Sequence, residues 1–348
     1  MSKLDSDIIR LLRFPLAVMV VFLHSEPSIE GWNITNVSYL HLIKADIVGI
    51  IMYSISHILT QTAVPLFFLI SGYLFFVKLE EWDYKIYRRK MLSRVRTLLV
   101  PYLIWVTLFC GIHIFRHILP IGGIHDFHVN LCKWLSDQGG VCNLYWSSSK
   151  WIYGASNIFG NKVIMTGPMP FHLWFLRDLI VAVILSPLYF FLFRRGDEKS
   201  TILSRVSIVI LIILALLQIQ TKVPGLDTSS LAYYGIGAFL SLNRKSLAFS
   251  FRFRYLVASI AFVMFVILIP MDGSKTPIGS MLFPLWIFTG VLTILNMMAA
   301  YVRKNKITDI VNRVNNSVFF LYIIHPFFLG IGASIVSHFM TLLGGGER

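Results

Sequence analysis

The sequence predicts an all-α integral membrane protein, a polytopic transmembrane helical bundle of about nine to ten spans, folded as one domain over residues 1–348. Of its residues, 56% are hydrophobic and only 14% are charged, and the mean hydropathy is +0.71. A soluble chain with so few charges could not cover its surface. Apolar runs that are long enough to cross a bilayer recur along the chain, and basic residues gather between alternate pairs of them.

The basic residues predict the orientation of the bundle. The formal net charge is +14, and most of the 31 lysine and arginine residues fall in five segments, near residues 3–13, 78–96, 194–205, 244–254 and 303–313. If the N-terminus is cytoplasmic and the spans alternate, all five segments lie on the inner side, as the positive-inside rule requires. This placement accounts for the charge, so no nucleic-acid partner is expected.

The first predicted span covers residues 8–25 and runs outward, with Pro15 near its start, where a missing N–H costs least. A signal peptide is the competing interpretation, but no small-residue cleavage pattern follows His24. Residues 26–44 are polar and external. The apolar run 46–77 is too long for one untilted span, so we expect an inward span at 61–77 and a helix at 46–60 on or in the outer leaflet.

The charged segment 78–96 is the strongest predicted cytoplasmic marker, and residues 97–118 then run outward. Residues 119–170 form the longest non-spanning segment, and because long loops are usually functional, we expect substrate recognition there. Cys132 and Cys142 lie there, and an oxidising exterior leaves a disulfide between them open, with Cys110 as a buried thiol. Nearby histidines have helical spacings, but no compact Cys/His pattern accompanies them, so no metal is expected; they are His113, His117, His125 and His128.

The remaining spans are predicted at 171–193, 202–219, 229–243, 255–271, 279–301 and 317–342, which gives about nine in total with an external C-terminus. A tenth span, if there is one, is expected at 46–60. No internal repeat, heptad pattern or low-complexity linker is visible, so the chain is predicted to be one bundle.

Arg13 and His24 mark the first span as the candidate catalytic helix. The eleven steps between them return to within roughly 20° of the starting direction, so both side chains leave one face, roughly 16 Å apart along the axis. The histidine could take a proton from a hydroxyl near neutral pH. Arg13 has two interpretations: a flanking charge that snorkels to the inner surface, or a guanidinium that clamps phosphate.

The spacing from Arg13 to His24 resembles the Arg-X10-His signature of acyltransferase family 3, integral membrane O-acyltransferases that include sugar O-acetyltransferases. Four further stretches are similar to the family pattern and follow in its order: Pro65 to Tyr73, the basic run that ends in Val100-Pro101-Tyr102, His172 to Leu176, and Tyr322 to Pro326. The resemblance implies about ten spans and a catalytic role for His24. It also implies that Arg13 helps to hold the acyl-donor cofactor.

The other candidate residues have structural alternatives. Ser71 and Gly72 suit close helix packing, while Ser71 as a family-matching position could line the site and donate a hydrogen bond. His172 and Trp174 could bind substrate, or could serve as a helix cap and an interfacial aromatic. The roles of His325 are evenly open, because Pro326 frees a backbone carbonyl nearby. Arg177 and Asp178 are each expected to pair with another helix.

The resemblance, together with these residues, implies a bacterial inner-membrane enzyme that moves an acyl group, most simply acetyl, from cytoplasmic acyl-CoA to a hydroxyl of a cell-surface glycan or its precursor. We expect Arg13, Arg94 and Arg96 to hold the donor phosphates. His24 is expected to act as general base or, less simply, as an acylated nucleophile. The main alternative is a secondary transporter or flippase for a glycan or a lipid-linked precursor, and a membrane scaffold or sensor is a third.

Overall fold

The structure is a computed structural model, and it describes residues 1–24, 47–79, 81–120, 125–156, 162–194, 196, 198–219, 221, 223–271, 276–305, 309–326 and 328–329. The predicted external segment 26–44 and the end of the span predicted at 317–342 lie outside these residues. Helices dominate the described part, as predicted, and a single two-stranded sheet accompanies them.

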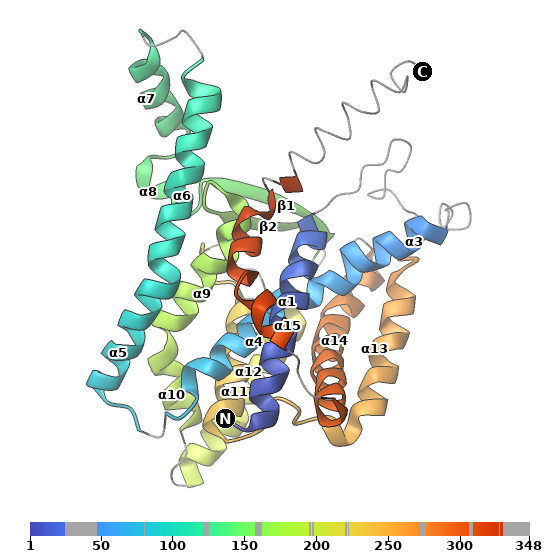
Figure 1. The fold of residues 1–348 in the computed structure, drawn as a ribbon. Helices are drawn as coiled ribbons and strands as arrows, with labels where there is room; N and C mark the ends of the chain where they lie inside the picture. Colours follow the sequence, from blue (N-terminus) through green and yellow to red (C-terminus); the bar gives the residue numbers. More distant parts are fainter. Residues whose placement is uncertain are drawn as a thin grey trace.

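The helical elements follow the chain in one bundle (Figure 1). The first half contains α1 (Lys3–His24), α3 (Ile47–Tyr53), α4 (Ala63–Phe76), α5 (Tyr84–Arg94), α6 (Val100–His113), α7 (Phe127–Asp137) and α8 (Val141–Leu144). The second half contains α9 (Trp174–Ile184), α10 (Ser186–Phe193), α11 (Glu198–Leu217), α12 (Thr228–Leu242), α13 (Arg254–Leu268), α14 (Pro277–Lys304) and α15 (Asp309–Asn315). Residues 318–326 are also helical.

Helix α1 begins earlier than predicted. It starts at Lys3, so Pro15 lies inside the helix rather than near its start, and one backbone hydrogen bond is absent at that point. The buried side of α1 is apolar apart from Asp5, and it packs against α4 and α14; its members are Ile8, Ile9, Leu12, Leu16, Ala17 and Val20. The helix therefore includes a charged turn before the apolar stretch, residues 8–25, from which the span was predicted.

Residues 50–76 form one continuous helical run, so the predicted division into a helix at 46–60 and a span at 61–77 is wrong. A π-helical turn (Ser54–Ile58) and a 3-10 turn (Leu59–Thr62) occupy the predicted boundary instead of a break. Hydroxyl side chains of Ser54, Ser56 and Thr60 bond to carbonyl oxygens four residues earlier. Bonds of this kind, from a hydroxyl to the carbonyl one turn earlier, can bend a helix without ending it.

Helices α4 and α12 approach each other most closely at two glycines. A Cβ on Gly72 would overlap the carbonyl oxygen of Tyr234, and a Cβ on Gly237 would overlap the carbonyl oxygen of Leu69. Each glycine therefore receives the backbone of the other helix, as small residues do in membrane bundles. The close packing predicted for the Ser71-Gly72 pair is confirmed.

Among the described residues, five helices are long and apolar enough to cross a membrane, or six if α9 and α10 form one span bent by 52°. Pro187 follows directly on that bend, which explains it. Helix α1 carries Lys3, Asp5, Asp7, Arg10 and Arg13 and is not among these helices. An integral membrane bundle is thus supported, and the count of about nine to ten spans stays a prediction.

The segment predicted as an irregular external region carries regular structure. It contains α7, α8 and an antiparallel hairpin of β1 (Ser149–Ser156) and β2 (Lys162–Gly167). The hairpin is an exception to the predicted all-α class. It lies at the end of the bundle where α1 finishes and α9 begins (Figure 1). The 3-10 turn Phe171–Leu173 connects it to α9.

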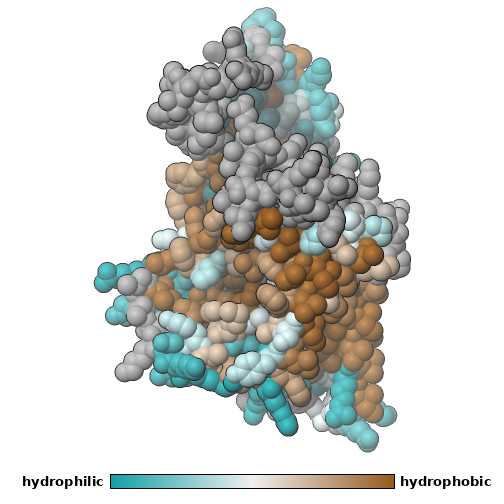
Figure 2. Space-filling model, turned by 90° about the vertical axis from the view of Figure 1, so that its right-hand side faces the viewer, coloured by the Kyte–Doolittle hydropathy of each residue, from teal (hydrophilic) through white to brown (hydrophobic). Residues whose placement is uncertain are grey.

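The predicted inner basic segments meet at the opposite end. Residues from the N-terminus and from the ends of α4, α10 and α12 line one cavity there, which contains Lys78, Arg194, Arg244 and Lys245. In Figure 2, hydrophilic residues form the lower end of the molecule, beneath a broad hydrophobic surface. This separation is typical of a protein with one basic aqueous face and a lipid-facing belt.

Candidate functional site

Three histidines from separate parts of the chain form one cluster. The rings of His24 and His325 stack with centroids 5.1 Å apart and planes inclined by 27°. The His172 ring meets the His325 ring edge-on at 5.5 Å. His172 and His325 are almost completely buried, and His24 is partly buried. The structure thus brings together three residues that the sequence singles out separately.

Each histidine lies at a distinct structural position. His24 is the last residue of α1, His172 lies in the 3-10 turn before α9, and His325 lies in the helical segment 318–326. All three therefore lie near the hairpin end of the bundle. The cluster closes where the first helix, the start of α9 and the C-terminal segment converge.

Hydrogen bonds of Tyr322 fix the backbone of His172 and the ring of His325. Its hydroxyl donates to the His172 carbonyl oxygen at 2.6 Å, and its own carbonyl oxygen lies 2.6 Å from Nδ1 of His325. A carbonyl oxygen only accepts, so Nδ1 of His325 carries the hydrogen, and the neutral ring presents the Nε2 lone pair.

The Nε2 atoms of His172 and His325 are buried without a hydrogen-bond partner among the described residues. A buried polar atom without a partner is costly, and such atoms are rare in folded proteins. Two of them in one cluster indicate that a polar ligand completes the site. The arrangement can accept or relay a proton from a bound hydroxyl group.

Arg13 is exposed, whereas its helical neighbours Leu12 and Leu16 are buried. Arg10, one turn earlier, donates to Asn312 Oδ1 at 2.5 Å and 3.2 Å, and Asn315 donates to the Arg10 carbonyl oxygen at 2.7 Å. Helix α15 thus lies along this flank of α1. The spacing of Arg13 and His24 places them on one face by helix geometry, and no contact among the described residues links Arg13 to the histidine cluster.

The other predicted substrate residues lie around the cluster without direct ring contact to it. Trp174 is partly buried and is the first residue of α9. Its neighbour Phe175 contacts Tyr322 at 5.7 Å and Phe68 of α4 at 4.9 Å. Ser71, which is partly buried, lies one turn beyond Phe68 on α4. Their roles in binding stay predictions.

Arg94 and Arg96 have different surroundings, although only one residue lies between them in the sequence. Arg94 lies over the ring of Phe75 on α4, with 5.9 Å between the guanidinium carbon and the ring centroid. Arg96 is exposed, in the π-helical turn Val95–Leu99 that follows α5. Neither is placed beside Arg13 by a described contact, so a joint phosphate site of these three arginines stays a prediction.

Arg177 and Asp178 pair with each other, contrary to the expectation that each pairs only with another helix. The Arg177 guanidinium donates to the Asp178 carboxylate at 2.7 Å, and both side chains are buried. The long arginine side chain curls back along α9, which makes contact between adjacent residues possible. Arg177 also donates to the Trp146 carbonyl oxygen at 2.6 Å and lies over the Trp146 ring. The pair thereby fixes the segment before the hairpin to α9.

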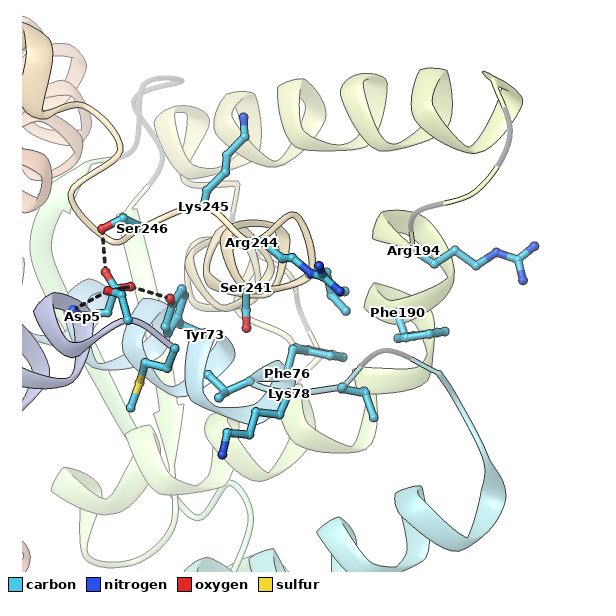
Figure 3. Close-up of a pocket in the computed structure, with 15 residues that line it drawn as sticks. Asp5, Tyr73, Phe76, Lys78, Phe190, Arg194, Ser241, Arg244, Lys245 and Ser246 are labelled. Carbon is cyan, nitrogen blue, oxygen red and sulfur yellow. Dashed lines mark hydrogen bonds between the residues drawn. The ribbon is translucent and has the colours of Figure 1, made fainter.

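Sequence reasoning missed a polar network around Asp5. Its Oδ1 accepts from the Ser246 hydroxyl at 2.6 Å and from the Leu247 amide at 2.9 Å. Its Oδ2 accepts from the Ser2 hydroxyl at 2.6 Å and from the Tyr73 hydroxyl at 3.0 Å (Figure 3). Burial alone would raise the pKa of Asp5, but these four hydrogen bonds together lower it. The signal in the sequence that could have indicated this network is an acidic residue, Asp5, close to the apolar stretch of the first helix.

The thiol and metal expectations have separate outcomes. Cys132 and Cys142 are free and exposed, so no disulfide joins them in the structure, and Cys110 is a buried free thiol as predicted. The His113 ring stacks on Trp134 at 5.3 Å and contacts the His117 ring at 4.8 Å. Within the described residues, no group of three or more metal-ligating side chains is suited to hold an ion.

A comparison with protein families matches residues 7–345 to a family described as an acyltransferase domain. The match spans nearly the whole chain and includes all five stretches named from the sequence. A comparison with curated proteins and one with solved structures give no significant match.

Proposed function

The chain belongs to acyltransferase family 3, and from this premise we propose that it transfers an acyl group, most simply acetyl, from cytoplasmic acyl-CoA to a hydroxyl of a cell-surface glycan or its precursor. The observation that carries the proposal is the contact of His24 with His325 and of His325 with His172, where two Nε2 atoms have no partner in the part of the chain that the structure describes. The proposed location is the bacterial inner membrane.

In this reaction His24 acts as general base. It takes the proton of the acceptor hydroxyl while the hydroxyl oxygen attacks the thioester carbonyl carbon. A new C–O bond forms, the C–S bond breaks, and the thiolate that leaves takes up a proton to become a thiol. Direct attack by His24, to give an acyl-histidine, is the less simple route and would require a second transfer step.

His325 and His172 support this step. Stacking against His325 limits the orientations open to the His24 ring, and the Tyr322 carbonyl oxygen fixes the His325 tautomer. The unpartnered Nε2 of His325 accepts a hydrogen bond from the acceptor or from an intervening water. Pre-set orientation of this kind lowers the cost of reaching the reactive geometry.

The donor side of the proposal relies on three arginines, of which Arg13 lies midway along α1. Arg13 shares a face of α1 with His24, and a guanidinium there suits a phosphate of the donor. Arg94 and Arg96 are the further proposed donor ligands, from the segment that leads into α6. No metal takes part in this mechanism.

The test uses the full chain in proteoliposomes with radiolabelled acetyl-CoA and an extract of surface-glycan precursors. We expect label in glycan with the wild type and a loss of about 10²-fold or more with His24→Ala. His128→Ala is the matched control, because His128 is exposed on α7 and lies outside the cluster. Near wild-type transfer by His24→Ala would remove the proposal, as would movement of unmodified glycan without any label transfer, which is the result for a transporter.

A further inference from the structure

A cavity of about 490 Å³ opens at the end of the bundle opposite the histidines. Its lining comes from the N-terminus and from the ends of α4, α10 and α12 (Figure 3). Asp5 lines the cavity and His24 ends the same helix, so the two sites are separated by roughly 28 Å along α1. That distance is nearly the thickness of the hydrocarbon core. The cavity is therefore distinct from the histidine cluster.

Four cations surround this cavity: Lys78, Arg194, Arg244 and Lys245. Among the described lining residues Asp5 is the single acid, and both of its oxygens are occupied by hydrogen bonds from within the protein. Within the described residues, Lys78, Arg194 and Lys245 form no ion pair. The lining thus has an excess of positive charge that its own carboxylate does not neutralise.

The backbone holds two of these cations in an unfavourable conformation. Lys78 follows α4 with φ of 60°, and Arg244 follows α12 with φ of 53°. Only one other non-glycine residue in the described part of the chain has positive φ, namely Gln218. Glycine is the usual residue where a helix ends in this conformation. Two basic side chains at such positions around one cavity point to a function that needs their charge.

The cavity also has an apolar wall, formed by Phe76, Val77, Leu79, Phe190 and Leu242. In Figure 3, the Arg244 side chain extends toward Phe190, whereas the ends of the Lys78, Arg194 and Lys245 side chains point away from the middle of the cavity. These cations are exposed, so their side chains change rotamer freely and can close on a ligand. A ligand that fits has an anionic group for the rim and an apolar or aromatic part for the wall.

We propose that this cavity binds a phosphate-bearing organic anion, held by Lys78, Arg194, Arg244 and Lys245 above the apolar wall. Guanidinium and ammonium groups are the usual protein ligands of phosphate. A water-soluble nucleotide and the headgroup of an anionic phospholipid share this chemistry. The proposal does not rest on acyl transfer, because the cavity is separate from the histidines.

Binding is measured by isothermal titration calorimetry of the full chain in zwitterionic nanodiscs, first with ADP and with sodium pyrophosphate as probes. For the phospholipid source, native mass spectrometry detects retained phosphatidylglycerol after exchange into detergent. The test variant is Lys78→Gln/Arg244→Gln/Lys245→Gln. The matched control is Arg88→Gln/Arg89→Gln/Arg205→Gln, which removes the same charge from exposed residues of the predicted inner segments that do not line the cavity.

We expect at least one probe to bind the wild type and to lose about tenfold or more in affinity, or in retained lipid, in the cavity variant, with less than about a twofold change in the control. Binding of ADP identifies a soluble ligand, and retention of phosphatidylglycerol alone identifies a lipid. Equal losses in both variants, or no binding of any probe by the wild type, would overturn the proposal.

A second variant separates a loss of binding from a loss of folding. Lys78→Gly removes the charge and also relieves the positive φ, so the melting temperature should not fall while affinity for the probe does. His24→Ala should bind the probe like the wild type, which keeps this test separate from that of acyl transfer. Unchanged affinity in a stably folded Lys78→Gly protein would count against a role for this rim.

Discussion

His24 and His325, from the first and last described helical segments, stack with ring centroids 5.1 Å apart. The contact requires α1 and the segment 318–326 to lie side by side, and the hydrogen bonds between Arg10 and the α15 residues Asn312 and Asn315 hold them in that register. The stacked pair is therefore assembled only when both ends of the chain are in place. Residues near each terminus contribute to one candidate site.

His325→Gln should lower kcat by about 10²-fold and raise the acceptor KM with little change in the donor KM, because the stacking that orients His24 and the Nε2 acceptor of the acceptor's hydrogen bond are both lost. Steady-state kinetics with varied donor and acceptor measure this split. Circular dichroism and melting temperature serve as the control for folding. A large rise in KM without loss of kcat would instead assign His325 to substrate binding alone.

Arg13→Lys and Arg13→Gln separate the two interpretations of Arg13. If its guanidinium holds a donor phosphate in a bidentate manner, both substitutions should raise the donor KM by about tenfold or more, since an ammonium group cannot replace that geometry. If Arg13 only snorkels to the surface, Arg13→Lys should behave like the wild type. Transfer rates at graded acyl-CoA concentrations decide between them.

Gly72→Ala should destabilise the protein by several kcal/mol, about 3 kcal/mol or more, because the added Cβ overlaps the Tyr234 carbonyl oxygen across the α4–α12 contact. Gly111→Ala is the matched control. Gly111 lies in α6, and an added Cβ there meets no atom within 4 Å, so its melting temperature should be unchanged or slightly higher. Equal melting temperatures for the two variants would contradict the close approach.

Composition and spacing predict the class of fold and much of the site, because each depends on local pattern. The Arg13 to His24 spacing places two side chains on one face by helix geometry alone. The sequence also nominates His172 and His325, but their convergence depends on how distant segments pack, which no local pattern contains. The same limit explains the Arg177 and Asp178 pair, because the sequence does not show which carboxylate a flexible arginine side chain will contact.

The polar network around Asp5 was missed for a related reason. Asp5 lies two positions from the chain's first helix residue, and sequence alone treats such an acid as a solvated helix start. Its partners Tyr73, Ser246 and Leu247 come from two distant segments. The continuous helix at residues 50–76 was missed because hydroxyl side chains bridge its irregular turns, and hydropathy does not register such bonds.

Asp5 should make stability depend on pH. Its pKa lies below the usual value of 3.8, so the stabilisation is complete above about pH 5 and is lost as pH falls below 3.8 toward the folded-state pKa. Asp5→Asn should lower stability by about 1–3 kcal/mol near neutral pH and flatten this acid dependence. Melting temperatures between pH 3 and pH 7 test it, with Asp7→Asn as the control, since Asp7 pairs only with the partly exposed Arg10. An acid dependence that survives in Asp5→Asn would show that other groups cause it.

Free thiols in the segment before the hairpin provide a direct test of orientation. The predicted cytoplasmic N-terminus places Cys132 and Cys142 outside, and both are exposed and unbridged, whereas Cys110 is buried. A membrane-impermeant maleimide should therefore label intact cells without reductant, and Cys132→Ser/Cys142→Ser should abolish that label. In this double variant, Lys85→Cys, in the basic segment, should react only after permeabilisation. Labelling of Lys85→Cys in intact cells would reverse the orientation and place the basic cavity outside. Labelling of the native thiols only after reduction would instead reveal a disulfide between them.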